Sequence, residues 1–204
     1  MSRIVLYMWM SLDGFITGPD DGPGLGLGRG GERLHQALAL DDGADPTSIR
    51  AADEVSAQVL AEAMDTGAVL TGRRTFDHGG RWNGDHHDGV PIFVLTRSTP
   101  AEPAPGHARW VTDVREAAAL ARNAAGDRDV LLHGAEAARA FLAAGELDEL
   151  SLQIVPVLLG QGRRLFDGMP PEHVELELVR VLEHPEVLHT RYRVRKADAR
   201  EVPL

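Results

Sequence analysis

The hydrophobic positions of the chain form short, nearly continuous apolar runs that are separated by amphipathic segments. The first run, residues 3–10, is β-branched, aromatic or aliphatic at almost every position. Strands with this pattern are buried on both faces, because helices cover both sides of the sheet to which they belong. Residues 68–71, 91–96 and 129–133 have the same character. We therefore expect a central sheet made of buried strands.

Amphipathic segments between these runs indicate the helices of an α/β protein. Asp113 and Glu116 have the spacing of a capping box, which favours a helix start at that point. Alanine dominates two of the segments and suits helices that pack closely on a sheet. Helices are predicted at residues 32–40, 49–66, 113–126 and 135–144.

The last third of the chain changes from helix–strand alternation to strands. Residues 147–158 include one more strand, and residues 174–182 and 187–194 alternate apolar and polar side chains. His184, Pro185 and Glu186 join these last two segments, which is typical of an antiparallel hairpin at a sheet edge. We expect one domain over residues 1–196, with a mainly parallel sheet and an antiparallel C-terminal hairpin, followed by a tail at residues 197–204.

Composition narrows the possible chemistry. The 204 residues include 21 Lys and Arg against 31 Asp and Glu, so the net charge is −10 and general binding to nucleic acid is disfavoured. Cysteine is absent, which excludes disulfides and thiolate chemistry, and the only lysine is Lys196 in the charged tail region. Residues 4–10 are too short to span a bilayer and lack a signal-peptide pattern, so we expect a cytoplasmic protein.

Polar residues and glycines follow three of the buried strands. They occur as TGRRT at residues 71–75, LTRS at residues 95–98 and HGAE at residues 133–136. In an open α/β sheet, ligands bind beyond the carboxyl ends of the strands, where glycine turns and helix N-termini accept phosphate groups. Arginines at two strand ends favour a ribose 2′-phosphate, hence NADP(H) over NAD(H). The alternative is that the arginines are surface residues and the glycines only cap helices.

Three other features have competing interpretations. Residues 26–31 match G-x-G-x-x-G, but no strand precedes them, so we interpret residues 18–31 as a flexible loop that could act as a lid. His86 and His87 lie in a glycine-rich context, and we expect a solvated loop there rather than a metal site. His133 either lines the cofactor crevice or is a packed core histidine. Asp13 follows the first strand and either anchors a substrate or proton at the crevice or forms an Asp-Gly turn.

The ordered set of motifs resembles a known family. MSLDGFI, GGERLH, TGRRTF, PIFVLTR, LLHGAEAAR and ELSLQIVPVLLGQGRRLF occur in one order between residues 4 and 194. Together they resemble the dihydrofolate reductase-like superfamily, and more closely its branch related to the C-terminal reductase domain of the riboflavin-biosynthesis deaminase-reductase. The resemblance implies a three-layer α/β fold, bound NADPH, a homodimer and a stand-alone reductase-like protein.

The resemblance also implies roles for individual residues. Asp13 would face the substrate and is the candidate catalytic residue. Cofactor-binding positions fall in four groups: Gly72, Arg73, Arg74 and Thr75 at the phosphates; Thr96, Arg97 and Ser98 near the adenosine ribose; His133, Gly134, Ala135 and Glu136 under the pyrophosphate; and Gly160, Gln161 and Gly162 in a glycine-rich loop. Ala135 and Gln161 depart from the family, which often has glycine at both positions.

The function that this resemblance implies is NADPH-dependent reduction of a small heterocycle. The substrate would be pterin- or folate-like, or a ribosylaminopyrimidine, as for the 5-amino-6-(5-phosphoribosylamino)uracil reductase of riboflavin biosynthesis. The cofactor, and not a protein nucleophile, would carry the reaction. The alternatives are a non-catalytic NADP(H)-binding module that keeps the fold and an interaction domain without a cofactor.

Overall fold

The computed structural model describes residues 2–22, 24–36, 38–40, 49–51, 53–169 and 173–196. Within these ranges, no helix is both long enough and apolar enough to cross a membrane. In chain order, the elements are β1 (Ile4–Ser11), β2 (Phe15–Thr17), the 3-10 helix η1 (Gly31–His35), β3 (Leu38–Leu40), β4 (Ile49–Ala51), α1 (Glu54–Met64), β5 (Ala68–Gly72), α2 (Arg73–His78), the 3-10 helix η2 (Gly80–Gly84), β6 (Ile92–Leu95), β7 (Ala108–Val111), α3 (Val114–Ala125), β8 (Val130–His133), α4 (Ala135–Ala143), β9 (Glu149–Val155), β10 (Arg163–Arg164), β11 (Leu176–His184) and β12 (Val187–Val194).

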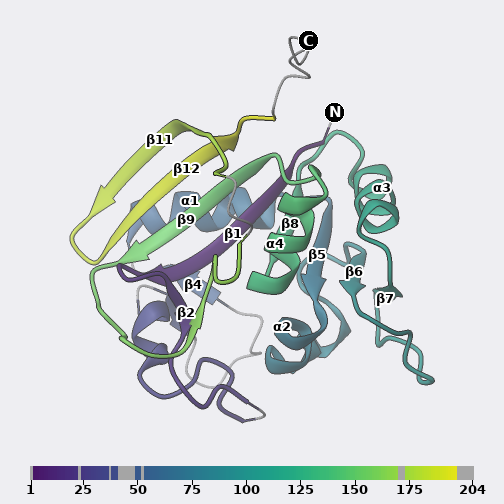
Figure 1. The fold of residues 1–204 in the computed structure, drawn as a ribbon, viewed down its shortest axis with the longest axis horizontal. Coiled ribbons are helices and arrows are strands. Elements are labelled where there is room, and N and C mark those ends of the chain that lie inside the picture. The colour runs from purple at the N-terminus through teal and green to yellow at the C-terminus, as the bar shows by residue number, and fades with distance from the viewer. Residues whose placement is uncertain are drawn as a thin grey trace, which may run out of the picture.

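The main sheet has eight strands in the order β11-β12-β9-β1-β8-β5-β6-β7. Neighbouring strands from β9 to β7 are parallel, whereas β12 is antiparallel to β9 and β11 is antiparallel to β12. The predicted mainly parallel sheet with an antiparallel C-terminal hairpin is therefore confirmed. Helices lie on both faces, with α4 in front of the sheet and α1 behind it in Figure 1, so the fold has three layers.

Side chains of the central strands alternate between two cores. Ile4 and Leu6 of β1 pack with the alanines of α3 and α4, which let these helices approach the sheet closely. Tyr7 and Trp9 of the same strand pack on the opposite face with residues of α1 and α2. Because each strand buries both sets of side chains, its sequence is apolar almost throughout.

Two of the predicted helices differ from the structure. Residues 32–40 form the short helix η1 and then β3, which pairs with β4. Residues 49–66 begin with β4, and α1 begins only at Glu54, because the Asp53 side chain accepts the backbone N–H of Ser56 and caps the helix there. The hairpin turn is shorter than expected, since β11 continues to His184. The predicted tail at residues 197–204 lies outside the described residues.

Strand β11 lies at one edge of the sheet and has an irregular register. The pairing with β12 shifts between Leu178 and Arg180, which is a β-bulge at Val179. Arg180 makes a bidentate ion pair with Glu62 of α1, with both N–O distances at 2.7 Å. The edge strand is thus anchored to the helix behind it.

A buried carboxylate, Glu149, joins the parallel and antiparallel parts of the sheet. It begins β9, and its side chain is 1% exposed. Nε of Arg191 on β12 donates to it at 2.6 Å, and Nη1 of Arg3, just before β1, donates at 3.2 Å. Nε of Arg193 lies 3.6 Å away. A buried carboxylate requires such partners, because an unpaired charge in the interior is strongly destabilising.

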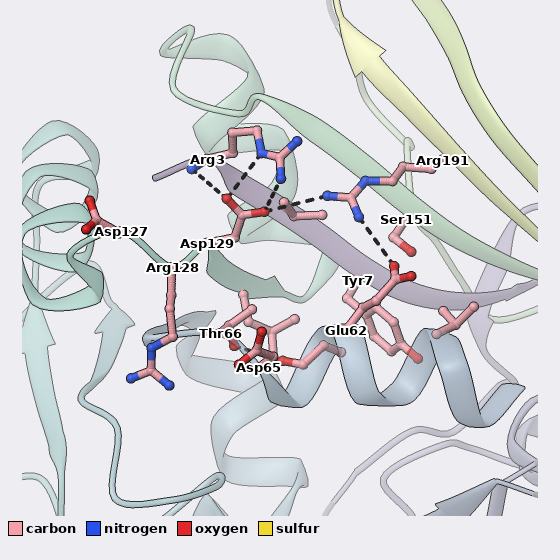
Figure 2. A pocket seen from close by; sticks show the side chains of 14 residues that line it. Arg3, Tyr7, Glu62, Asp65, Thr66, Asp127, Arg128, Asp129, Ser151 and Arg191 are labelled. Atoms are coloured by element: carbon pink, nitrogen blue, oxygen red, sulfur yellow. Dashed lines mark hydrogen bonds and ion pairs between the residues drawn. The ribbon is translucent and has the colours of Figure 1, made fainter. Parts of the chain in front are cut away.

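Arg3 and Arg191 also line a pocket of about 340 Å³ at the edge where the parallel strands begin. Figure 2 shows that Arg3 and Arg191 both point toward Asp129 and that Arg191 also reaches Glu62 of α1. These contacts connect the start of β1, the segment before β8, strand β12 and helix α1. We interpret the pocket as the gap within a structural charge network at the amino edge of the sheet.

We predict that Glu149→Gln destabilises the fold by about 2 kcal/mol, because a neutral amide replaces the buried, charged acceptor of Arg191 and Arg3. Urea unfolding monitored by circular dichroism measures this loss. Glu177→Gln is the matched control, since Glu177 pairs with Arg193 on the surface, and it should change the stability by less than about 1 kcal/mol. Equal effects of the two substitutions would contradict the role given to Glu149.

Candidate functional site

The three motifs that follow buried strands meet at the carboxyl edge of the sheet. Strands β8, β5 and β6 are adjacent and parallel, so their ends form one row. In the register of the sheet, Thr71 is opposite His133 and Gly72 is opposite Leu95. The motifs at residues 71–75, 95–98 and 133–136 are therefore neighbours, as predicted from the order of the strands.

The turns after β5 and β8 are in contact. Gly134 has a φ of +94°, and a Cβ at this position would lie only 2.4 Å from Oγ1 of Thr75. A residue with a side chain would be strained by this φ and would also push the two turns apart. Gly134 is thus required for the close approach of the first residues of α2 and α4.

The start of α4 has no side-chain cap. Its N-cap residue is Gly134, which offers no hydrogen-bonding side chain, whereas α1 and α3 are capped by the carboxylates of Asp53 and Asp113. Ala135 is 3% exposed and packs in the core with α3, so its side chain is directed away from the edge. Glu136 is exposed in the first turn of α4. The backbone N–H groups at this helix start are suited to bind an anion by donating hydrogen bonds to it.

The three arginines of the predicted site have different surroundings. Nε of Arg73 donates to Asp77 at 2.6 Å, and its guanidinium group lies over the Trp110 ring at 4.6 Å from the centroid. Arg74 forms an ion pair with Asp21 of the loop at residues 18–31. Arg97 is exposed, and no ion pair to it occurs among the described residues.

The neighbours of Arg97 lie in the turn after β6. The hydroxyl of Thr96 donates to the Ser98 carbonyl at 3.0 Å, and the Thr96 N–H donates to the Val111 carbonyl of β7. Ser98 is exposed like Arg97. This turn is therefore held by the Thr96 hydroxyl and by a backbone hydrogen bond to β7, while the side chains of Arg97 and Ser98 are accessible at the edge.

Asp13 follows β1 at the same edge and holds the loop after β9. Its carboxylate accepts hydrogen bonds from Oγ of Ser11 at 2.6 Å, from N of Leu159 at 3.1 Å and from N of Gly160 at 2.8 Å. Desolvation raises the pKa of Asp13, but these hydrogen bonds outweigh it and lower the pKa below its ordinary value. Asp13 is therefore ionised at neutral pH, and its assignment as the catalytic residue stays a prediction.

The rest of the loop at residues 160–162 also lies at this edge. Gly162 has a φ of +130°, and a Cβ there would lie 1.9 Å from the Thr17 carbonyl oxygen, which only glycine avoids. This contact brings β10 against β2. Gln161 is exposed and, with Gly162, lines a polar cleft of about 340 Å³ between this loop and α4.

A cluster of aromatic rings next to His133 was not predicted. Nε2 of His133 and Nε2 of His86 are 3.2 Å apart, and Nδ1 atoms of His86 and His87 are 2.7 Å apart. Trp82 packs edge-on against His86 at 4.6 Å between centroids. The expectation that His86 and His87 lie in a solvated loop is therefore wrong, because both are half-buried, His86 against His133 at the end of β8 and His87 against Thr66 before β5.

The backbone before these histidines explains why the sequence did not reveal the cluster. Arg81, Trp82 and Asn83 have φ values of 57°, 46° and 50°, so three successive residues adopt the left-handed conformation. Side chains rarely favour this conformation, and no local pattern predicts it. A tryptophan within a polar loop was the one available signal of packing. Among the described residues, no group of three His, Asp or Glu side chains is arranged to bind a metal ion.

Two histidines of this cluster, His133 and His86, are neutral at pH 7. Nδ1 of His133 faces the Tyr7 carbonyl at 3.0 Å, so we assign the ring proton to Nδ1. Burial lowers the pKa of His133 to about 4, and burial together with the neighbouring imidazoles lowers the pKa of His86 to about 2. Both values are below the ordinary value of about 6.5.

These pKa values predict that the fold loses stability in mild acid. Stability from the neutral histidines is complete above pH ~6.5 and falls toward pH 4, because the unfolded chain binds protons that the folded chain excludes. Between pH 7.5 and 5, the loss is up to about 2 kcal/mol per histidine. Urea unfolding at both pH values measures it. His86→Gln should reduce the loss, whereas His173→Gln at an exposed position should not; equal losses would contradict the assignment.

The chain is similar to known proteins in both sequence and fold. The family model of the RibD C-terminal domain matches residues 2–190. No curated protein has significant sequence similarity to the chain. A protein from Shewanella sp. PV-4 assigned to riboflavin biosynthesis has a similar fold, with a TM-score of 0.69 and 19% identity over 95% of this chain and 99% of that one. A pyrimidine reductase-like protein from Corynebacterium diphtheriae has a TM-score of 0.62 and 14% identity, with 96% and 92% covered.

A bifunctional protein is also similar in fold. It is the diaminohydroxyphosphoribosylaminopyrimidine deaminase/5-amino-6-(5-phosphoribosylamino)uracil reductase of Thermotoga maritima, with a TM-score of 0.58 and 16% identity. The similarity covers 95% of this chain and 57% of that protein. Identities at this level show a shared fold, and the family model adds the assignment by sequence. The chain therefore belongs to the RibD C-terminal domain family.

Proposed function

We propose that the protein is an NADPH-dependent reductase of a small heterocyclic substrate, of the riboflavin-pathway type. Membership of the RibD C-terminal domain family supports a reductase. The observation that carries the proposal is the contact between Gly134 and Thr75, which brings two strand-to-helix turns together at the carboxyl edge of the sheet. A dinucleotide carries its phosphates across such an edge.

The residues at this edge fit a dinucleotide with an extra phosphate. The glycine cap of α4 leaves backbone N–H groups for the diphosphate, whereas the aspartate cap of α3 would repel it. Arg97 and Ser98 are exposed at the end of β6 and suit the 2′-phosphate of NADPH. Arg73 is stacked on Trp110 and paired with Asp77, so it contributes mainly to the shape and charge of the edge.

NADPH supplies the hydride in reductions of this class. The chain would contribute binding, orientation and charge. Asp13 remains ionised and fixes the loop at Leu159 and Gly160 beside the end of β1, which would orient a polar substrate at the edge. The substrate class proposed is pterin-like or ribosylaminopyrimidine-like, and the cytoplasm is the proposed location.

The alternative function is a non-catalytic NADP(H)-binding module. Asp13 favours this reading in one respect, because three hydrogen bonds within the chain already occupy its carboxylate. The two functions differ in one measurement, which is NADPH oxidation in the presence of pterin, folate or aminopyrimidine substrates. Turnover supports the reductase, and tight NADPH binding without turnover of any of these substrates supports the module.

We also propose that the protein is a homodimer. Leu176, Leu178 and Val181 of β11 and Leu188 of β12 are exposed, and the register of the strands places all four on one face. Helix α1 lies behind these strands in Figure 1, so this is the opposite face. An apolar sheet face of this kind favours association with a second copy of the chain.

We predict that Arg97→Ala weakens NADPH binding by about tenfold or more and changes NADH binding by less than about twofold, because only NADPH has the 2′-phosphate. Fluorescence titration with both cofactors measures this. Arg128→Ala is the control, since Arg128 is exposed near the opposite edge of the sheet and should leave both affinities unchanged. Equal weakening of NADPH and NADH would refute the 2′-phosphate assignment, and no binding of either cofactor at millimolar concentration would refute the proposed function.

The homodimer proposal predicts that Leu178→Asp yields a monomer, because a carboxylate in the centre of an apolar interface is strongly unfavourable. Sedimentation equilibrium gives the mass of both proteins. Leu120→Asp is the control, as Leu120 is exposed on α3 and should leave the mass unchanged. A natural chain that sediments as a monomer at micromolar concentration would contradict the homodimer.

A further inference from the structure

Three basic side chains from two elements converge on one carboxylate at the carboxyl edge. Arg74 and His78 belong to α2, and Arg163 belongs to β10. The carboxylate is that of Asp21 in the loop at residues 18–31, and its side chain is only 13% exposed. Nε of Arg163 lies 3.4 Å from Oδ2 of Asp21, and Nδ1 of His78 lies 3.9 Å from the same oxygen.

The contact with Arg74 has the geometry that arginine uses for phosphate. Nε of Arg74 donates to Oδ2 of Asp21 at 3.1 Å, and Nη2 lies 3.0 Å from Oδ1, so two parallel N–O contacts form a fork. Nη2 also donates to the Asp21 carbonyl at 2.9 Å. Burial raises the pKa of Asp21, but the hydrogen bonds from Arg74 and Arg163 outweigh it and lower the pKa, so the carboxylate is ionised.

The position of this ion cluster links the two helix starts at the site. Arg74 lies in the first turn of α2, next to the turn that touches Gly134. Arg163 reaches toward α4, where its Nη1 is 3.9 Å from Glu136 in the first turn. The carboxylate of Asp21 therefore occupies basic side chains next to the helix starts where a phosphate group of a ligand is expected to bind.

The loop that carries Asp21 is closed by its own hydrogen bonds. Gly18 N–H donates to the Leu27 carbonyl at 2.8 Å, and Arg29 N–H donates to the Pro19 carbonyl at 2.9 Å. Asp20, just before Asp21, has a φ of 60°, in the left-handed region that aspartate adopts more readily than most residues with a side chain. These hydrogen bonds join residues of the loop to one another.

We propose that Arg74 and Arg163 form a phosphate-binding subsite that Asp21 fills in the free protein, so that a phosphate group binds by displacing Asp21. A phosphate dianion carries more charge than a carboxylate and offers more acceptor oxygens to the two guanidinium groups. The polar cleft beside the cluster, lined by Arg139, Arg163 and Arg164, gives the displacing group a path of entry. Asp21 would weaken phosphate binding by competing for the same donors.

Two sources can supply the phosphate. One is the dinucleotide cofactor of the proposed function, on which the inference rests in this respect, and the other is a phosphorylated substrate. Both present the same chemistry to Arg74 and Arg163. NADPH and ribose 5-phosphate are the probes that distinguish these sources, and inorganic pyrophosphate tests the subsite itself.

The test is calorimetric titration of Asp21→Asn with inorganic pyrophosphate at constant ionic strength. We expect this variant to bind at least about tenfold tighter than the natural chain, because the internal competitor has lost its charge. Asp127→Asn is the matched control, since Asp127 is an exposed aspartate at the amino edge of the sheet, and its affinity should stay within about twofold. Adding Arg163→Gln to Asp21→Asn should remove the gain in pyrophosphate affinity.

Circular dichroism verifies that each variant is folded. If Asp21→Asn is unstable, Asp21→Ser must reproduce the gain in pyrophosphate affinity.

Each outcome decides between the inference and the proposed function. A gain that extends to NADPH assigns the subsite to the cofactor, and a gain that extends to ribose 5-phosphate assigns it to the substrate. Equal affinities of the natural chain and Asp21→Asn for all three probes would overturn the inference, even if both bind NADPH and so uphold the proposed function. A gain for pyrophosphate and ribose 5-phosphate, with no NADPH binding, would support the subsite and refute NADPH as the cofactor.

Discussion

The buried carboxylate of Glu149 is the constraint on which the arrangement of the sheet depends. It lies at the start of β9, and the guanidinium groups that neutralise it come from the segment before β1 and from β12. A shift in register between the parallel and antiparallel halves would leave this buried carboxylate without its guanidinium partners, which is strongly unfavourable. The charges that stabilise the fold are concentrated at the amino edge of the sheet, which leaves the carboxyl edge for glycine turns and less heavily paired arginines.

The carboxyl edge shows how small differences in helix capping prepare a ligand site. Helix α3 begins with Asp113, whose side chain accepts the backbone N–H of Glu116, while α4 begins with a glycine that has no side chain to do so. Gly134 also permits the contact with Thr75, so one residue controls both the backbone donors and the distance between the two turns. The substitution of alanine for a usual family glycine at Ala135 is compatible with this design, because its methyl group packs in the core.

Local patterns predicted the buried strands of the main sheet, helices α3 and α4, and the position of the site edge. This was possible because buried parallel strands are apolar throughout and their carboxyl ends must share one edge. Contacts between distant segments were not predictable in the same way. Asp21 meets Arg74 across 53 positions of sequence, and His86 meets His133 across 47. Such pairs depend on loop conformations, including the left-handed backbone at Trp82, that no periodicity encodes.

The bulge in β11 has a consequence for how the chain behaves at high concentration. A straight nine-residue strand at the end of a sheet would offer its free backbone groups to the same strand of another molecule, and such additions have no natural limit. The shift at Val179 interrupts that row, and Arg180 turns toward Glu62 and the helix behind. Strand-by-strand addition of further molecules along this edge is therefore disfavoured, and the sheet does not extend into fibres through β11.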